Sequence, residues 1–86
     1  MPNFAAIYNG QIWGYGSSYD DAVNHAMATY QNYFPSDEPD ELMFMVYEVS
    51  DVLNYLLTTQ SDCRSISFVL HGMELLHHDV KLNRVY

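Results

Sequence analysis

The dipeptide Asn9-Gly10 constrains the fold more than any other feature of the sequence. A two-residue type I′ turn needs positive φ at both central positions, and Asn-Gly is among the pairs that adopt it most readily. Alternating residues flank the dipeptide on both sides. We therefore expect residues 4–15 to form a β-hairpin around this turn.

The turn also predicts which residues of the hairpin share a face. Counting outward, Tyr8 opposes Gln11, Ile7 opposes Ile12, Ala6 opposes Trp13 and Phe4 opposes Tyr15. Because opposed residues share a face, one face should be small and aliphatic and the other aromatic. The first set is Ala5, Ile7, Ile12 and Gly14, and the second is Phe4, Tyr8, Trp13 and Tyr15. We expect a helix on the first face, and the second to be covered by the chain or displayed to a partner.

A helix is predicted over residues 19–33, followed by an acidic loop over 35–41. Ser18 is a suitable N-cap, and carboxylates in the first turn, from Asp20 and Asp21, interact favourably with the helix dipole. Apolar residues then recur with the helical period until the proline that opens the loop.

The middle of the chain predicts a strand and a second helix. The nearly unbroken apolar run 42–49 is typical of a central strand buried on both sides. Ser50 then caps a helix. Its apolar stripe consists of Val52, Leu53, Leu56 and Leu57.

The last third of the chain is predicted to form a second hairpin. Residues 66–70 alternate as a strand does, and His71-Gly72 would be the turn, placing Leu70 beside Met73. A helix over 73–81 is the alternative, because Met73 and later apolar residues also fit the helical spacing. We prefer the hairpin because it keeps apolar residues on one face, and the tail 81–86 is a candidate edge strand.

These elements give the order ββαβαββ in one domain spanning residues 1–86. The predicted class is α+β, with a mainly antiparallel sheet and two helices packed on one face. A chain of 86 residues is too short to be divided into two stable units. The architecture by itself decides no function.

Charge is distributed unevenly along the chain. The net charge is −8, and the only bases, Arg64, Lys81 and Arg84, lie in the last quarter. We expect such a surface to bind neither nucleic acid nor membranes directly, because phosphates and anionic headgroups are met by Lys and Arg. A basic protein would be attracted to it. The alternative is that the acidity only keeps a Tyr-rich chain soluble.

The sequence predicts a cytoplasmic protein. The N-terminus lacks the basic region and long apolar run of a signal peptide, and no stretch approaches the roughly 18–20 apolar residues of a membrane span. The lone Cys63 cannot form an internal disulfide, which fits a reducing compartment.

No pattern in the sequence predicts catalysis, a metal or a cofactor. The densest polar cluster is His71, His77, His78 and Asp79. On a strand, His77 and His78 point to opposite faces and cannot bind one ion. Cys63 lacks the local signature of a nucleophile, and a lone cysteine is usually a small buried residue. A metal-dependent enzyme built on His71, His78 and Asp79 is the weakest alternative.

The remaining candidate is a surface for binding a partner. Carboxylates pair with Arg and Lys, while Tyr and Trp are enriched among binding hot spots. The predicted residues are Asp20, Asp21, Asp37, Glu38, Asp40 and Glu41, with Trp13, Tyr15 and Tyr19 as apolar anchors. Carboxylates spread over such a face could stand in for a phosphate backbone.

In size, acidity and lack of a catalytic motif, the chain resembles small phage-encoded inhibitors of host defences, anti-CRISPR proteins among them. This resemblance is one of type and implies no role for any single residue. The predicted function is a binding module, an inhibitor or DNA mimic that occupies the basic groove of a nucleic-acid-binding protein. The alternative is a structural homodimer that associates through exposed aromatic residues and an open edge strand.

Overall fold

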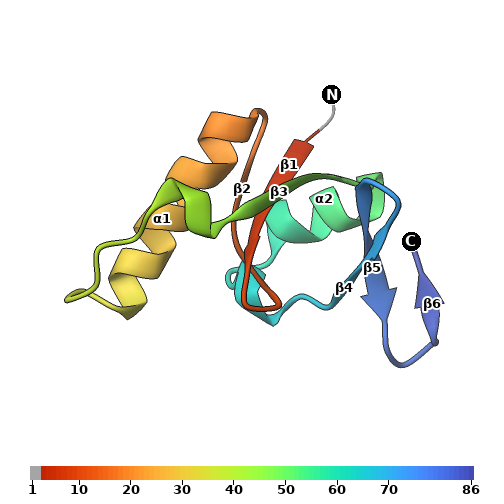
Figure 1. Ribbon diagram of the computed structural model, residues 1–86. Helices are drawn as coiled ribbons and strands as arrows, with labels where there is room; N and C mark the ends of the chain where they lie inside the picture. Colours follow the sequence, from red (N-terminus) through yellow and green to blue (C-terminus); the bar gives the residue numbers. More distant parts are fainter. Residues whose placement is uncertain (1–2) are drawn as a thin grey trace.

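The computed structural model describes residues 3–86 and places a mixed sheet between two helices (Figure 1). The elements are β1 (Asn3–Tyr8), β2 (Gln11–Gly16), α1 (Tyr19–Tyr33), the 3-10 turn η1 (Glu41–Met43), β3 (Met45–Val49), α2 (Asp51–Thr59), the 3-10 turn η2 (Cys63–Ser65), β4 (Phe68–His71), β5 (Glu74–Asp79) and β6 (Arg84–Val85). The strand order is β2-β1-β3-β5-β4, and β6 pairs with β5. The predicted α+β class and mainly antiparallel sheet are confirmed.

The first hairpin forms around Asn9-Gly10, with φ of 53° and 77° at the two turn residues. Ile7 opposes Ile12 as predicted, but the predicted register is wrong beyond this pair. The observed partners there are Ala6 with Gly14, Ala5 with Tyr15 and Phe4 with Gly16.

The physical reason for the shift is the close approach of α1 to β2. A Cβ atom at Gly14 would overlap the backbone of Ala26, so only glycine allows this approach. The extra residue of the bulge turns both Trp13 and Gly14 toward α1, and the strand then resumes with Tyr15 on the other face.

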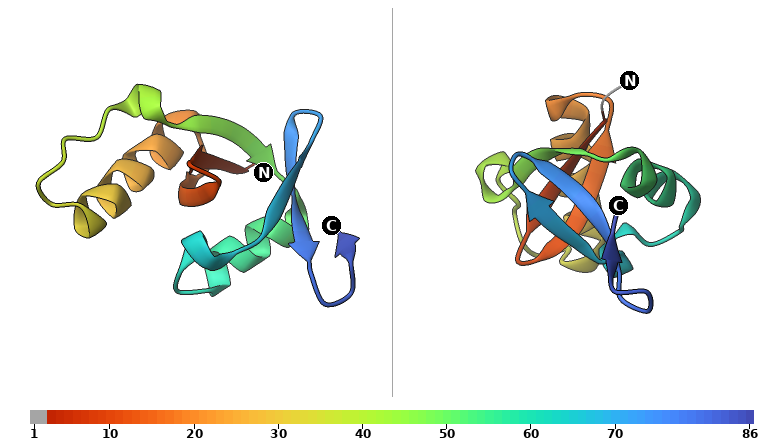
Figure 2. Two further views of the ribbon diagram at one scale, coloured as in Figure 1. Left: turned by 60° about the horizontal axis from the view of Figure 1, so that its bottom comes forward. Right: turned by 90° about the vertical axis from the view of Figure 1, so that its right-hand side faces the viewer.

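The two helices pack on the sheet, but on opposite faces and not on one face as predicted (Figure 2). Ala5 and Ala6 are consecutive in β1 and therefore point to opposite sides. Ala6 packs in the cluster of α1, and Ala5 packs in the cluster of α2. Because Ala5 and Ala6 are both fully buried, one helix must pack on each face of the sheet at β1.

The core accordingly has two parts. Between α1 and the sheet lie Ala6, Trp13, Ala22, Val23, Ala26 and Phe44. Between α2 and the sheet lie Ala5, Ile12, Val49, Leu53, Leu57, Cys63, Ile66 and Leu75. The largest fully buried side chains, Ile12, Leu53, Leu57 and Leu75, all belong to the second part.

Both helices begin at the predicted serine caps. Ser18 Oγ accepts a hydrogen bond from the Asp21 N–H at 3.1 Å, and Ser50 Oγ accepts one from the Leu53 N–H at 3.3 Å. The predicted bounds of α1 are confirmed. The strand predicted over 42–49 is shorter, because η1 occupies its start. It is also not buried on both sides as predicted, since within β3 only Val49 is buried and Met45 is exposed where β3 has no partner in β5.

The second hairpin replaces the alternative helix over 73–81, but its turn lies one residue later than predicted. Gly72 and Met73 form the turn, so Leu70 opposes Leu75 instead of Met73. Positive φ at the first turn position only, 65° at Gly72, fits a type II′ turn. This register buries Leu75 against α2 and leaves Met73 exposed at the tip.

The junction between the two halves of the sheet is narrow. β3 and β5 are parallel and share only the pairs Glu48–Glu74 and Val49–Leu75. β6, in the predicted edge position, pairs with the end of β5.

Candidate functional site

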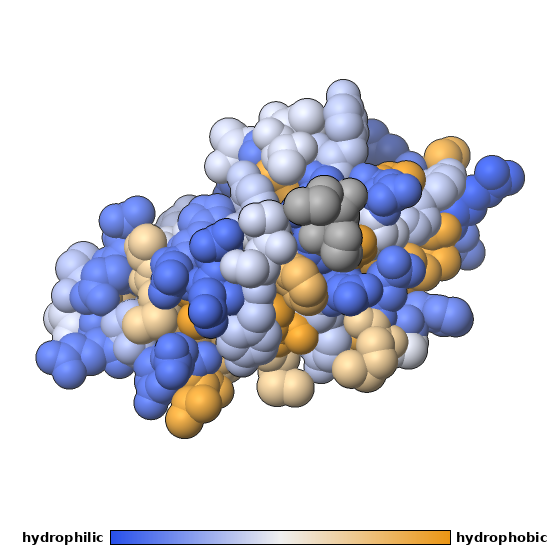
Figure 3. Space-filling view, turned by 90° about the horizontal axis from the view of Figure 1, so that it is seen from above, coloured by the Kyte–Doolittle hydropathy of each residue, from blue (hydrophilic) through white to orange (hydrophobic). Residues whose placement is uncertain are grey.

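The predicted carboxylates lie around α1 and the loop that follows it. α1 presents two of them in its first turn, and the loop then bends back so that η1 contacts the same helix (Figure 1). All six are exposed. This acidic surface consists of Asp20, Asp21, Asp37, Glu38, Asp40 and Glu41. Seen from above, hydrophilic side chains predominate at this end of the molecule, with a few apolar ones among them (Figure 3).

Side chains of α1 hold the acidic loop in place. Gln31 Nε2 donates a hydrogen bond to the Asp37 carbonyl at 2.9 Å, and the Tyr30 hydroxyl donates one to Asp37 Oδ2 at 3.1 Å. Desolvation raises the pKa of Tyr30, and the hydrogen bond to Asp37 and the charge of that carboxylate raise it further. The phenol therefore stays protonated and remains a donor at neutral pH. Asp40 Oδ1 accepts from the Leu42 N–H at 2.9 Å and caps η1.

Three carboxylates of the acidic surface have no such internal role. Asp20, Glu38 and Glu41 are exposed and have no side-chain partner among residues 3–86. Asp21 differs, because its Oδ2 accepts a hydrogen bond from the Ser17 hydroxyl at 3.2 Å. The surface thus combines carboxylates that fix the backbone with carboxylates whose charge is directed at solvent.

The three predicted aromatic anchors differ in accessibility. Trp13 is only 3% exposed, and its indole N–H donates to the Tyr8 carbonyl at 2.8 Å. A role as surface anchor is inconsistent with this burial. Tyr15 is half-buried, with its ring 4.8 Å from that of His25. Tyr19, at 54% exposed, is accessible to a partner.

Sequence reasoning missed other apolar residues at the acidic surface. Phe34 and Leu42 lie at the two ends of the acidic loop, and Leu42 is 84% exposed. The apolar run 42–49 predicts a buried strand, and this prediction is wrong at Leu42. The adjoining acidic residues Asp40 and Glu41 were the available signal, because a strand flanked by a solvated loop begins at the surface.

The guanidinium of Arg64 packs on aromatic side chains at the end of α1. The Arg64 guanidinium lies over the rings of Trp13 and Tyr33, at 4.4 and 4.0 Å from their centroids. Its Nη2 donates to Gln11 Oε1 at 3.5 Å, while its Nε is buried without a partner among residues 3–86. Arg64 is thus held by aromatic rings and not by a carboxylate.

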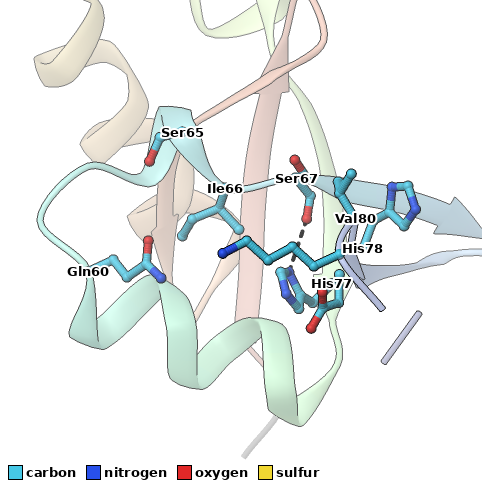
Figure 4. Close-up of a pocket in the computed structure, with 9 residues that line it drawn as sticks. Gln60, Ser65, Ile66, Ser67, His77, His78 and Val80 are labelled. Carbon is cyan, nitrogen blue, oxygen red and sulfur yellow. Dashed lines mark hydrogen bonds between the residues drawn. The ribbon is translucent and has the colours of Figure 1, made fainter. Parts of the chain in front are cut away.

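His77, His78 and Asp79 line a pocket of about 280 Å³ between the end of α2 and β5 (Figure 4), whereas His71 lies at the end of β4, exposed and outside this pocket. His77 Nδ1 lies 3.2 Å from the Ser67 carbonyl, which can only accept, so Nδ1 carries the proton. The His78 ring points away from His77, and among residues 3–86 no three ligands are placed to hold a metal ion. The Ser65 hydroxyl donates to the Asp62 carbonyl at 2.8 Å instead of to a histidine.

Cys63 is buried, and its thiol donates to the Ile12 carbonyl at 3.4 Å. Burial raises the pKa of this thiol, and the negative charge of Asp62 raises it further. The thiolate is the nucleophilic form, so this environment disfavours reactivity.

No known protein family matches the chain, and neither a curated protein nor a solved structure is significantly similar to it. Within residues 3–86, no helix has the length and apolar character needed to cross a bilayer.

Proposed function

We propose that this protein is a binding module whose acidic surface occupies the basic groove of a nucleic-acid-binding protein. The observation that carries the proposal is the set of exposed carboxylates on α1 and the acidic loop, three of which have no side-chain partner in the described part of the chain, residues 3–86. Grooves that bind nucleic acid are lined with Lys and Arg and are attracted to any surface that presents negative charge in place of phosphate.

The conformation of the loop supports binding at this surface. Gln31 binds the backbone carbonyl of Asp37 and Tyr30 binds its carboxylate, so the loop is ordered before a partner arrives. A loop that is already ordered loses less conformational entropy on binding, which favours affinity.

Apolar side chains beside the carboxylates provide contact area. Tyr19, Phe34 and Leu42 are exposed around α1 and the loop. Aromatic residues are enriched among binding hot spots, and the rim around them is usually polar. We infer that charge attracts the partner and that these three residues add short-range affinity.

We propose binding in preference to catalysis because two potential nucleophiles of the chain are engaged in hydrogen bonds to the backbone. The Cys63 thiol and the Ser65 hydroxyl both donate to backbone carbonyls. Inhibition of the partner, as by the phage-encoded inhibitors that the chain resembles in type, would follow directly from occupying its groove.

The test is capture of the partner from host lysate on immobilised protein, with elution in steps of rising salt. We expect a basic nucleic-acid-binding protein, released at moderate salt and displaced by its own DNA or RNA. Glu38→Lys with Glu41→Lys should abolish capture. Glu48→Lys with Glu74→Lys is the matched control, because it changes the net charge equally at exposed positions outside the acidic surface.

Equal loss of capture in both double variants would mean that only net charge matters, with no defined surface. Unchanged capture by Glu38→Lys with Glu41→Lys would contradict the proposal.

A further inference from the structure

The two outer edges of the sheet are treated differently. On β2, the backbone of Tyr15 faces away from β1, and its N–H donates to His25 Nδ1 at 3.1 Å. The outward carbonyl of Ile12 accepts from the Cys63 thiol at 3.4 Å. α1 and η2 thus cover this edge, which is how soluble proteins prevent strands from adding to it.

The edge at β4 is open. The His78 N–H donates to the Ser67 carbonyl at 3.0 Å. This bond shows which residues of the two strands exchange hydrogen bonds and which face away from each other. Since alternate residues of an antiparallel strand face its neighbour, Val69 bonds to β5 and Phe68 and Leu70 point their backbone groups outward. Within residues 3–86, no strand pairs with this side of β4.

The side chains around β4 do not protect the edge either. Leu70 is 48% exposed, and Met73 at the tip of the hairpin is 78% exposed. Exposed edges normally carry Lys, Pro or a bulge that prevents pairing. Residues 65–73 contain no Lys, no Pro and no carboxylate.

We propose that β4 is a dimerisation edge, at which two copies of this chain pair antiparallel and form one continuous sheet. Val69 would lie on the two-fold axis, with Phe68 opposite Leu70 of the partner subunit. This register uses the outward N–H and C=O of both Phe68 and Leu70, and it is self-complementary as a two-fold contact requires.

Charge favours a second copy at this edge over any other part of the surface. Copies with a net charge of −8 repel each other, most strongly where their acidic surfaces meet. The stretch 65–73 has no carboxylate, and β4 lies at the end of the molecule away from α1 and the acidic loop (Figure 1). A dimer through β4 therefore leaves both acidic surfaces outward and free.

The first test is the mass of the purified protein in solution by sedimentation or light scattering. We expect twice the chain mass of 10.0 kDa. Leu70→Pro removes an outward N–H that β5 does not use, and Leu70→Lys adds the charge that protects natural edges. Both should give the mass of one chain, while Leu42→Lys, an equally drastic change at an exposed leucine of η1, should remain dimeric.

A second test reports the register directly. Val69→Cys in a Cys63→Ala background should form a disulfide-linked dimer on mild oxidation, because opposed residues that do not exchange ladder hydrogen bonds have close Cα atoms. Met73→Cys in the same background, although more exposed, should cross-link much less. Circular dichroism establishes that each variant is folded.

A wild-type protein that stays monomeric at the highest soluble concentration would overturn the proposal. A dimer that survives both Leu70 substitutions in folded protein would overturn it as well, since the contact would then lie elsewhere. Neither result depends on capture of a partner, so the dimer and the proposed function can fail separately.

Discussion

The guanidinium carbon of Arg64 lies 4.0 Å from the centroid of the Tyr33 ring. Tyr33 ends α1, and Arg64 belongs to η2, so this stacking joins two elements that are distant in sequence. The same guanidinium covers Trp13 at 4.4 Å. Arg64 contacts two perpendicular rings and, within residues 3–86, no carboxylate, so it acts here as part of the packing.

We predict that Arg64→Ala destabilises the fold by about 2 kcal/mol, because it removes a partly desolvated cation–π contact. Arg64→Lys should recover less than half of this loss, since a compact ammonium lacks the extended guanidinium that contacts both rings, which stand at 86° to each other. Urea unfolding measures both values. Equal stability of Arg64→Ala and wild type would show that the stacking contributes nothing.

Gly14→Ala is predicted to be far more damaging than Gly10→Ala. The added Cβ at Gly14 meets the backbone of α1, which cannot yield as a flexible side chain would, so we expect a loss of about 3 kcal/mol or failure to fold. At Gly10 the space is open and only the positive φ is strained, at a cost of about 1 kcal/mol. Denaturant midpoints of the two variants compare them, and equal losses would contradict the tight approach of α1.

The environment of Cys63 predicts slow alkylation by iodoacetamide in the folded protein and rapid alkylation in urea. It also predicts a pH dependence. Because burial raises the folded pKa above the ordinary value of 9.0, the thiol's contribution is complete below that value, and stability falls as pH rises through the folded pKa. Cys63→Ala should lack this part of the alkaline decline. Identical alkaline profiles would contradict the raised pKa.

Tyr30→Phe should loosen the acidic loop without changing its charge. The variant loses the hydroxyl that donates to Asp37, so the backbone amides of the non-proline residues within 36–40 are expected to exchange hydrogen faster, while those of α1 stay protected. Mass spectrometry of exchanged peptides measures this. Capture of the partner should weaken in parallel if loop order contributes to affinity.

Local signals predicted the local structure well. A serine cap and a proline enclose α1, and Asn9-Gly10 determines its own turn, so these features need no knowledge of the rest of the chain. The bulge at Trp13 is different, because it depends on how closely α1 approaches Gly14. That distance is a property of the packed molecule.

The second hairpin and the site illustrate the same limit. Either His71-Gly72 or Gly72-Met73 could form the turn, because both pairs contain Gly72. The burial of Leu75 against α2 decides between the two registers. The exposure of the six carboxylates followed from their place on a loop and a helix start. The burial of Trp13 depends on the end of α1, which no pattern near Trp13 indicates.

The narrow junction between β3 and β5 has a consequence for the mechanics of the molecule. With only two residue pairs across it, one of them Glu48 beside Glu74, the backbone contributes little to the continuity of the sheet. Leu75, pressed against Leu53 and Leu57, supplies the continuity instead. Under tension or partial denaturation the sheet should separate along this line into a part with β2, β1 and β3 and a part with β5, β4 and β6, which are joined mainly by side chains of the core.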